Sequence, residues 1–238
     1  MVHTGGNRRG LMRARFPNQT APPMFRRLNG LVVFVASACG MLPMAFAAPA
    51  PSMGASPRWT VYAGQLFAND LPPFMFDAVR GRLQTRDSYL LGGSWFQPTR
   101  TPDWLANAFS FPGMQSVTTG VEFIGLQHFR HQHDMEVDIA YMVHTPYTSW
   151  SGLLLRAGGG IGPSLALARP SAEDGPTDAP TRRTRLQNYI GLELEASLVD
   201  SPDIAMVLRL HHRSGAYGLV APNGVGSNFL SAGLRFAF

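Results

Sequence analysis

A histidine and a serine stand two residues apart at the end of an apolar stretch, and together they could carry out nucleophilic chemistry. Side chains two apart on an extended strand point the same way, with Cβ atoms roughly 7 Å apart. His212 and Ser214 therefore share the face of the preceding alternate residues, Ile204, Met206, Leu208 and Leu210. Ser214 would be the nucleophile and His212 its general base. The alternative is that the pair only marks where the strand meets water.

The elements that must position this pair are strands. The chain has 25 Gly and 19 Pro, is 45% hydrophobic and only 15% charged, and these values favour a folded all-β unit over a helical or disordered chain. Segments of about ten residues alternate apolar with small or charged residues, which is the period of a strand with two different faces. We expect eight strands, over 59–67, 86–95, 118–128, 134–143, 152–167, 185–198, 203–213 and 229–238.

The last of these segments favours a membrane barrel over a water-soluble sandwich, which could show the same alternation. Its apolar face ends at the terminal residue Phe238. An amphipathic final strand with a terminal Phe is similar to the signal by which the barrel-assembly machinery recognises bacterial outer-membrane proteins. Eight is also an allowed, even number of strands. The sequence therefore predicts an all-β, eight-stranded antiparallel transmembrane β-barrel in the bacterial cell outer membrane.

Strand direction then places the pair. With both ends of the barrel in the periplasm, the outward connections are 68–85, 129–133, 168–184 and 214–228, and His212 and Ser214 lie level with the outer leaflet. Trp side chains favour the boundary between membrane and water. The same directions put Trp59, Trp95 and Trp150 at the periplasmic rim. A short helix is expected over 103–107.

The inward face of the predicted strands is charged. It carries Glu122, Glu136, Asp138, Glu193 and Glu195 together with Arg156, Arg209 and Arg235. Opposite charges can pair inside an eight-stranded barrel, which is too narrow for open water, so we expect an ion-pair network and not a solute channel. His128, His131, His133 and Asp134 are spaced loosely like metal ligands, but we interpret them as exposed polar residues of an outer loop and predict no metal site.

The N-terminal region has the three parts of a secretory signal peptide. We expect residues 1–47 to be the signal peptide, residues 48–57 to be a linker, and residues 58–238 to be the barrel. Met24 is an alternative translation start. An uncleaved anchor and lipidation at Cys39 are the alternatives. Six of the 20 basic residues precede residue 48, so the mature chain is close to neutral and nucleic-acid binding is not expected. Cleavage also removes the single cysteine, which excludes disulfides and a thiolate nucleophile.

The run from His212 to Gly218, followed by Pro222-Asn223-Gly224, resembles the PagL-type lipid A 3-O-deacylases of the acyloxyacyl hydrolase family, with His-x-Ser, a Gly-containing turn and a Pro-Asn. The Gly-rich segment 157–162 is also similar, and the likeness covers the C-terminal third best. The resemblance implies an outer-membrane serine esterase that removes an ester-linked acyl chain from lipid A. Its partners would be lipopolysaccharide and outer-membrane lipid, and it would need no metal or organic cofactor.

The resemblance assigns Ser214 as nucleophile, His212 as base, and Asn223 with the N–H of Gly218 as the oxyanion site. The family has a Glu shortly after the Pro-Asn, whereas 224–228 contains no acid. Asn228 can orient His212 as a neutral amide in its place. Gly215 also stands where the family has Asn. The alternative function is a non-catalytic structural or binding barrel, and whether two copies form a homodimer stays open.

Overall fold

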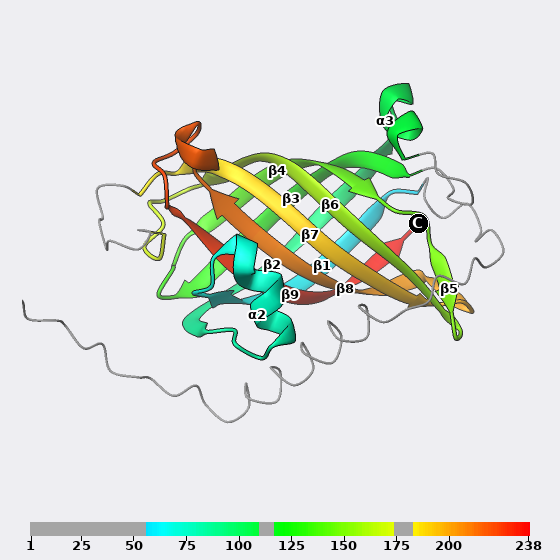
Figure 1. The fold of residues 1–238 in the computed structure, drawn as a ribbon, viewed down its shortest axis with the longest axis horizontal. Coiled ribbons are helices and arrows are strands. Elements are labelled where there is room, and N and C mark those ends of the chain that lie inside the picture. Colours follow the sequence, from blue (N-terminus) through cyan, green and yellow to red (C-terminus); the bar gives the residue numbers. More distant parts are fainter. Residues whose placement is uncertain (1–55, 110–116, 174–182) are drawn as a thin grey trace, which may run out of the picture.

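The computed structural model describes residues 56–109, 117–173 and 183–238. Its eight long strands are β1 (Arg58–Phe67), β2 (Thr85–Thr99), β3 (Thr118–Arg130), β4 (Met135–His144), β6 (Leu153–Ala166), β7 (Leu186–Leu198), β8 (Ser201–Ser214) and β9 (Gly226–Ala237). Each pairs antiparallel with its neighbours, and pairing of β1 with β9 and of β4 with β6 closes the sheet into a barrel (Figure 1). The predicted eight-stranded antiparallel barrel is confirmed. The predicted signal peptide and most of the linker lie outside the described residues.

The strand boundaries differ from the predicted ones by a few residues. The largest difference is in β2, which continues to Thr99, and β3 continues to Arg130. A ninth, three-residue strand, β5 (Thr148–Trp150), pairs with the start of β6 and was not expected, because three residues are too few to show a period.

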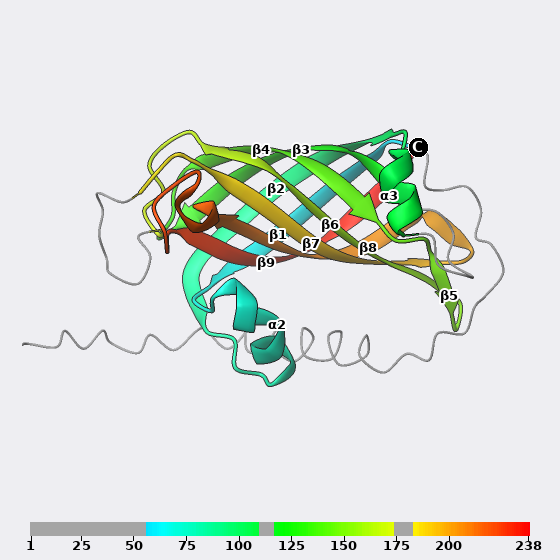
Figure 2. The ribbon, with the colours of Figure 1, turned by 45° about the horizontal axis from the view of Figure 1, so that its top comes forward.

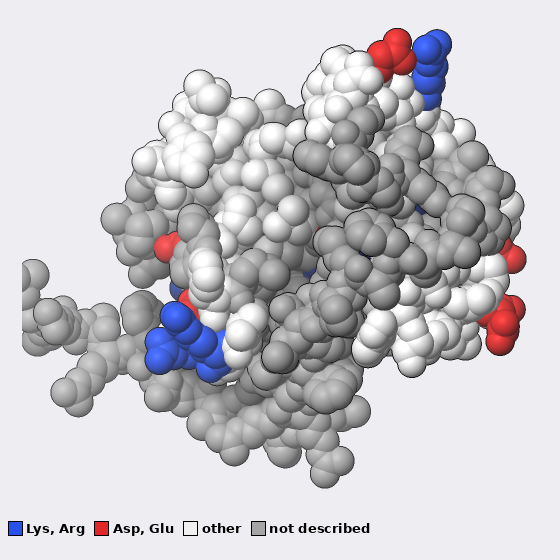
Figure 3. Space-filling model, turned by 45° about the vertical axis from the view of Figure 1, so that its right-hand side comes forward, with Lys and Arg blue, Asp and Glu red and all other residues white. Residues whose placement is uncertain are grey.

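The barrel is apolar outside and polar inside. On β4, for example, Val137 and Ile139 are exposed on the outer wall, whereas Glu136 and Asp138 are buried in the lumen. On the face drawn in Figure 3 the described surface is mostly uncharged, and the charged residues gather near its margins. This is the distribution expected of a barrel whose wall faces lipid.

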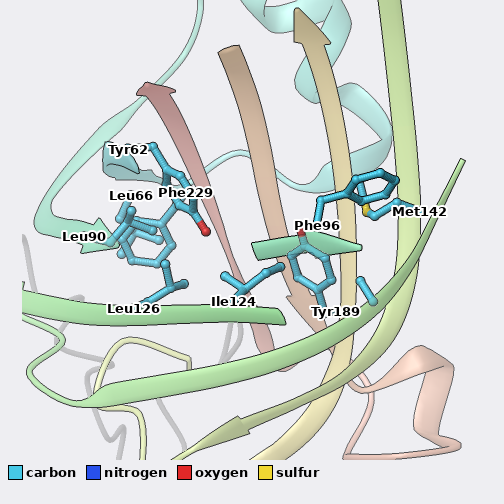
Figure 4. Packing of buried hydrophobic residues seen from close by; sticks show 10 residues of the cluster. Tyr62, Leu66, Leu90, Phe96, Ile124, Leu126, Met142, Tyr189 and Phe229 are labelled. Atoms are coloured by element: carbon cyan, nitrogen blue, oxygen red, sulfur yellow. The ribbon is translucent and has the colours of Figure 1, made fainter. Parts of the chain in front are cut away.

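Side chains fill the lumen. Aromatic and aliphatic residues form a packed cluster, in which Tyr62, Phe96, Tyr189 and Phe229 are the largest members (Figure 4). Charged residues pair among them, as the sequence predicted. Arg209 Nη2 lies 2.7 Å from Glu122 Oε1 and 2.6 Å from Glu193 Oε2. Further pairs join Arg235 to Glu193 and Glu195, and Arg156 to Glu195.

Aromatic residues mark the end of the barrel that carries the C terminus. Trp59 and Trp95 are partners on β1 and β2, with ring centroids 4.7 Å apart. Phe236 on β9 lies opposite Trp59 on the other side, and β5 with Trp150 lies at the same end (Figure 1). The helix α3 (Asp103–Ala108) confirms the expected short helix in the connection between β2 and β3. These features agree with the predicted girdle.

A second helix, α2 (Leu71–Val79), lies between β1 and β2 at the other end and was not predicted. It lies alongside the outer wall and does not cover the barrel mouth (Figure 2). Two prolines follow Leu71 in the first turn, where a missing N–H costs no hydrogen bond. No helix in the described ranges is both long and apolar enough to span a membrane.

Candidate active site

His212 and Ser214 lie near the outer end of β8, on the wall that faces away from the lumen. Pairing on both sides fixes their neighbours. His212 lies opposite Asn228 of β9, and Ser214 lies opposite Gly226. The residues between and beside them, His211 and Arg213, point inward and are fully buried. The structure therefore gives the pair the outward orientation that the alternation predicts.

Asn228 holds the imidazole of His212. Asn228 Oδ1 lies 2.7 Å from His212 Nδ1, and Asn228 Nδ2 donates a hydrogen bond to the backbone carbonyl of Asn69, also at 2.7 Å. The Asn69 carbonyl can only accept, so the Asn228 amide must point its NH₂ group toward it and its oxygen toward His212. Nδ1 of a neutral His212 then carries the proton, and Nε2 keeps a lone pair that can accept another.

Asn69 is in turn held in place by its side chain. Asn69 Nδ2 donates to Asp77 Oδ2 at 2.8 Å, and Asn69 Oδ1 accepts a hydrogen bond from the backbone N–H of Gln84 at the same distance. Asp77 belongs to α2. A carboxylate therefore contributes to the positioning of His212, but it acts through two asparagines and does not contact the imidazole.

The helix α2 is attached to the wall beneath this chain of hydrogen bonds by apolar packing. Phe74 is 2% exposed and packs edge to face on Phe67 of β1, with centroids 5.8 Å apart. The same cluster includes Leu210 of β8, two residues before His212, and Leu230 of β9, two residues after Asn228. Leu210 was expected to face lipid, but α2 covers it.

Ser214 is less constrained than His212. In the described structure no hydrogen bond joins the two side chains, and contact needs both to rotate toward each other. The position opposite Ser214 must be glycine. Gly226 has φ of 142°, and a Cβ there would lie 2.1 Å from the carbonyl oxygen of Arg213. The Ser214 hydroxyl consequently has no side chain across from it on β9.

Asn188 is a site residue that the sequence did not reveal. It is the partner of Ser214 on the other neighbouring strand, β7, and both side chains are on the outer wall. Directly opposite residues in an antiparallel pair have Cβ atoms about 5 Å apart. The alternation places Asn188 on the outer face of 185–198, but only the register brings it next to Ser214.

The outer-rim loop, residues 215–225, turns back on itself directly after Ser214. The Gly215 carbonyl accepts hydrogen bonds from the N–H groups of Gly218, Val220 and Ala221. A Cβ at Gly215 would lie 2.3 Å from the Ala221 carbonyl oxygen, so the close approach of the loop requires glycine at this position. The N–H of Gly218, predicted as an oxyanion donor, is thus already engaged within the loop, and Asn223 lies exposed beyond it.

Apolar side chains project from both segments that adjoin the pair. Tyr217 and Leu219 of the outer-rim loop are 92% and 88% exposed. Three successive residues, Ala216 to Gly218, have positive φ, which turns the chain sharply here. On α2, Phe76 is 66% exposed and Val79 is about half exposed. Exposed apolar groups of this size suit contact with lipid.

On the inner side of the same strands, Glu173 closes the barrel mouth. It comes from the connection between β6 and β7, is fully buried, and both of its oxygens lie 2.9 Å from Arg213 Nη1. Its Oε1 also accepts a hydrogen bond from the hydroxyl of Ser227, the residue before Asn228. One carboxylate therefore ties β8 to β9 directly behind His212 and Asn228.

The predicted outer-loop residues divide between two environments. His131 and His133 are exposed, as expected, but His128 is fully buried inside β3, with Nε2 2.9 Å from Glu136 Oε2. The expectation of an exposed His128 was wrong because β3 extends further than predicted. Asp134, in the same turn, is also buried, and burial raises the pKa of its carboxyl group.

No protein-family model and no curated protein matches the chain. Among solved structures, the outer membrane enzyme PagL is 12% identical with a TM-score of 0.48, covering 76% of this chain and 99% of that one. Neisserial surface protein A is also 12% identical, with a TM-score of 0.44 and coverage of 76% and 97%. The N-terminal β-barrel domain of Pseudomonas aeruginosa OprF has a TM-score of 0.39 at 12% identity, covering 77% and 98%. At this identity the similarity concerns the fold alone.

Proposed function

We propose that this chain is an outer-membrane serine esterase that removes an ester-linked acyl chain from lipid A in the outer leaflet. The observation that supports this most is the chain of hydrogen bonds from Asn69 through Asn228 to His212, which prepares an imidazole base on the lipid-facing wall next to Ser214. Polar groups on such a wall are costly unless they serve a purpose there.

The proposed reaction begins with attack of Ser214 Oγ on the ester carbonyl, while His212 Nε2 takes the hydroxyl proton. The tetrahedral intermediate then expels the sugar alkoxide, which receives that proton, and an acyl-serine remains. Water repeats the sequence, losing a proton to His212 as it attacks the acyl group, and the fatty acid leaves. Asn228 keeps the imidazole oriented throughout, although a neutral amide stabilises the imidazolium less than a carboxylate does.

Two asparagines are candidates to bind the oxyanion. Asn188 lies beside Ser214 on β7 and is part of a rigid strand, whereas Asn223 belongs to the outer-rim loop. A donor on a strand is held in place before the charge develops, which is what makes such donors effective. We therefore assign the oxyanion to Asn188 first, with Asn223 as the second donor.

The position of the pair supports a substrate embedded in the membrane. His212 and Ser214 face outward, and the exposed apolar residues of α2 and the outer-rim loop adjoin them. An acyl chain lying along the barrel wall can reach the serine without leaving the bilayer. Lipid A carries acyl esters in the leaflet that this end of the barrel would occupy, and the His-x-Ser pattern resembles that of lipid A deacylases.

The test is mass spectrometry of lipid A from cells that produce the protein or its Ser214→Ala variant. We expect a Ser214-dependent loss of one hydroxyacyl chain. Ser201→Ala, at the opposite end of the same strand, is the matched control and should behave as the parent does. An identical lipid A profile with and without Ser214, in a protein that folds, would refute the proposal and favour a structural or binding barrel.

A further inference from the structure

The outer half of the lumen holds a second cluster of reactive groups, unrelated to the serine. Glu136 and Asp138 of β4 and His211 of β8 are all buried, and one donor atom from each lies within 4.8 Å of the other two. His211 Nε2 is 2.7 Å from Glu136 Oε1 and 3.9 Å from Asp138 Oδ2. Because β4 and β8 are not adjacent in the sheet, the cluster joins opposite walls of the lumen.

Asp138 is the least satisfied member of this cluster. Its side chain is 2% exposed, and neither carboxylate oxygen has a hydrogen-bond partner among the described residues. The His211 imidazole lies 3.9 Å from its Oδ2, beyond hydrogen-bond distance. A buried carboxylate without hydrogen bonds is strongly unfavourable, so Asp138 needs either a proton or a cation.

The distribution of charge along the lumen supports a cation. In the inner half, the carboxylates of Glu122, Glu193 and Glu195 face four buried guanidinium groups, those of Arg58, Arg156, Arg209 and Arg235. In the outer half, the described residues place four buried carboxylates against the guanidinium of Arg213. One of them, Asp134, belongs to the turn before β4. The other three, those of Glu136, Asp138 and Glu173, already leave two negative charges over, which is the charge that one divalent ion neutralises.

We propose that Glu136, Asp138 and His211 bind a divalent transition-metal ion of the Zn²⁺ type inside the barrel. One imidazole and two carboxylates suit Zn²⁺ better than Ca²⁺ or Mg²⁺, which prefer oxygen ligands alone. With bonds of about 2.0–2.2 Å, tetrahedral ligands lie roughly 3.4 Å apart, between the two distances seen here. On binding, the ion replaces the proton of His211 Nε2.

The surroundings already orient the ligands. The second oxygen of Glu136 lies 2.9 Å from His128 Nε2 and 3.5 Å from Arg213 Nε, and the ring of Tyr189 lies against His211 with centroids 4.7 Å apart. Outer contacts of this kind fix the direction in which ligand atoms point. Since Gln132 and Glu173 close the mouth above, the ion would enter as the barrel folds.

The test uses the untagged full chain, refolded from urea into detergent micelles with or without ZnCl₂ and then dialysed against metal-free buffer. We expect one retained zinc per chain, and at free zinc 100 times the Kd the unfolding equilibrium constant should fall about 100-fold. Asp138→Asn should lower zinc affinity at least tenfold. It removes a buried charge, so the variant should still fold.

Two control variants identify the site. Asp134→Asn removes a nearby buried carboxylate, and a double His131→Ala/His133→Ala variant removes the exposed histidines; both should retain zinc. Ser214→Ala should bind zinc as the parent does, so the outcome does not depend on the esterase proposal. No retained zinc in the parent, or zinc lost with the exposed histidines, would show that Asp138 is neutralised by a proton and overturn the proposal.

Discussion

Asn228 lies directly opposite His212 on the neighbouring strand, with its Oδ1 2.7 Å from His212 Nδ1. The position is occupied by an amide because its other group must donate to the carbonyl of Asn69. A carboxylate in the same place would face that carbonyl oxygen with a negative charge.

Replacement of Asn228 therefore tests the orientation of the base. We expect Asn228→Ala to lower kcat at least tenfold, which corresponds to about 1.4 kcal/mol in the activation barrier. Asn228→Asp should not exceed the parent, despite its charge, because it loses the bond to Asn69. Turnover of a lipid ester in mixed micelles gives the comparison, and an Asp variant more active than the parent would contradict this assignment.

Asn188 and Asn223 compete for the role of oxyanion donor. We expect Asn188→Ala to lower kcat by about 10²-fold to 10³-fold with little change in KM, since the donor acts on charge that develops only in the transition state. Asn223→Ala should have a smaller effect. Steady-state kinetics of the two variants separates them, and a larger loss for Asn223→Ala would move the oxyanion site into the outer-rim loop.

The attachment of α2 links packing to activity. Phe74→Ala removes a buried aromatic ring, a change that typically costs about 3–5 kcal/mol, and should release the helix from the wall. With it goes the Asn69 carbonyl, so activity should fall about as far as in Asn228→Ala. Phe76→Ala, on the exposed side of the same helix, is the control.

The combined Phe74→Ala/Asn228→Ala variant distinguishes this link from a general loss of stability. If both changes act through the same hydrogen bond, the double variant should be scarcely less active than either single one. Limited proteolysis should cut between residues 68 and 84 faster in the Phe74→Ala protein. Losses that simply multiply would mean that α2 does not position Asn228.

Glu173 should carry much of the stability of the outer end. Glu173→Gln removes the nearer of the two carboxylates that pair with the buried Arg213, and only Glu136 remains, at 3.5 Å. Breaking a buried pair typically costs about 3–5 kcal/mol. Heat-dependent migration of the folded barrel on electrophoresis reports the change. Asp103→Asn, which breaks an exposed pair with Arg100, should leave the transition where it was.

Asp134 predicts how stability responds to pH. Burial raises the pKa of its carboxyl group in the folded chain, whereas in the unfolded chain this pKa is about 3.9. The protonated form is thus favoured by folding, and its contribution is fully present below pH 4 and lost as pH rises through the folded pKa. Asp134→Asn should be more stable than the parent at pH 7, with the difference vanishing near pH 4. Urea titrations at both pH values measure it.

The alternation of residues was enough to predict the strands, the inward charges and the outward direction of His212 and Ser214. Each of these depends only on whether a position is odd or even within a strand. Asn188 could not be found this way, because its place beside Ser214 depends on the register between β7 and β8. The Asn69 contact uses a backbone carbonyl, which no residue type reveals.

The helix α2 escaped prediction for a different reason. It is nine residues long and has two prolines in its first turn, so its sequence differs little from that of a loop. Its apolar residues make sense only once the outer wall of β1, β8 and β9 is present to pack against. His128 was predicted to lie in an outer loop because the predicted strand ended two residues too early. Its hydrogen bond to Glu136 inside the lumen was therefore not foreseen.

Two consecutive histidines on β8 lie in different surroundings. His211 points into the lumen toward Glu136, and His212 points out toward Asn228. A single inserted or deleted residue in this strand would exchange their directions, so that His211 would face lipid and His212 would lie among the buried charges of the lumen. A substitution at one position therefore leaves the surroundings of the other unchanged, whereas a change in the length of β8 would disable both at once.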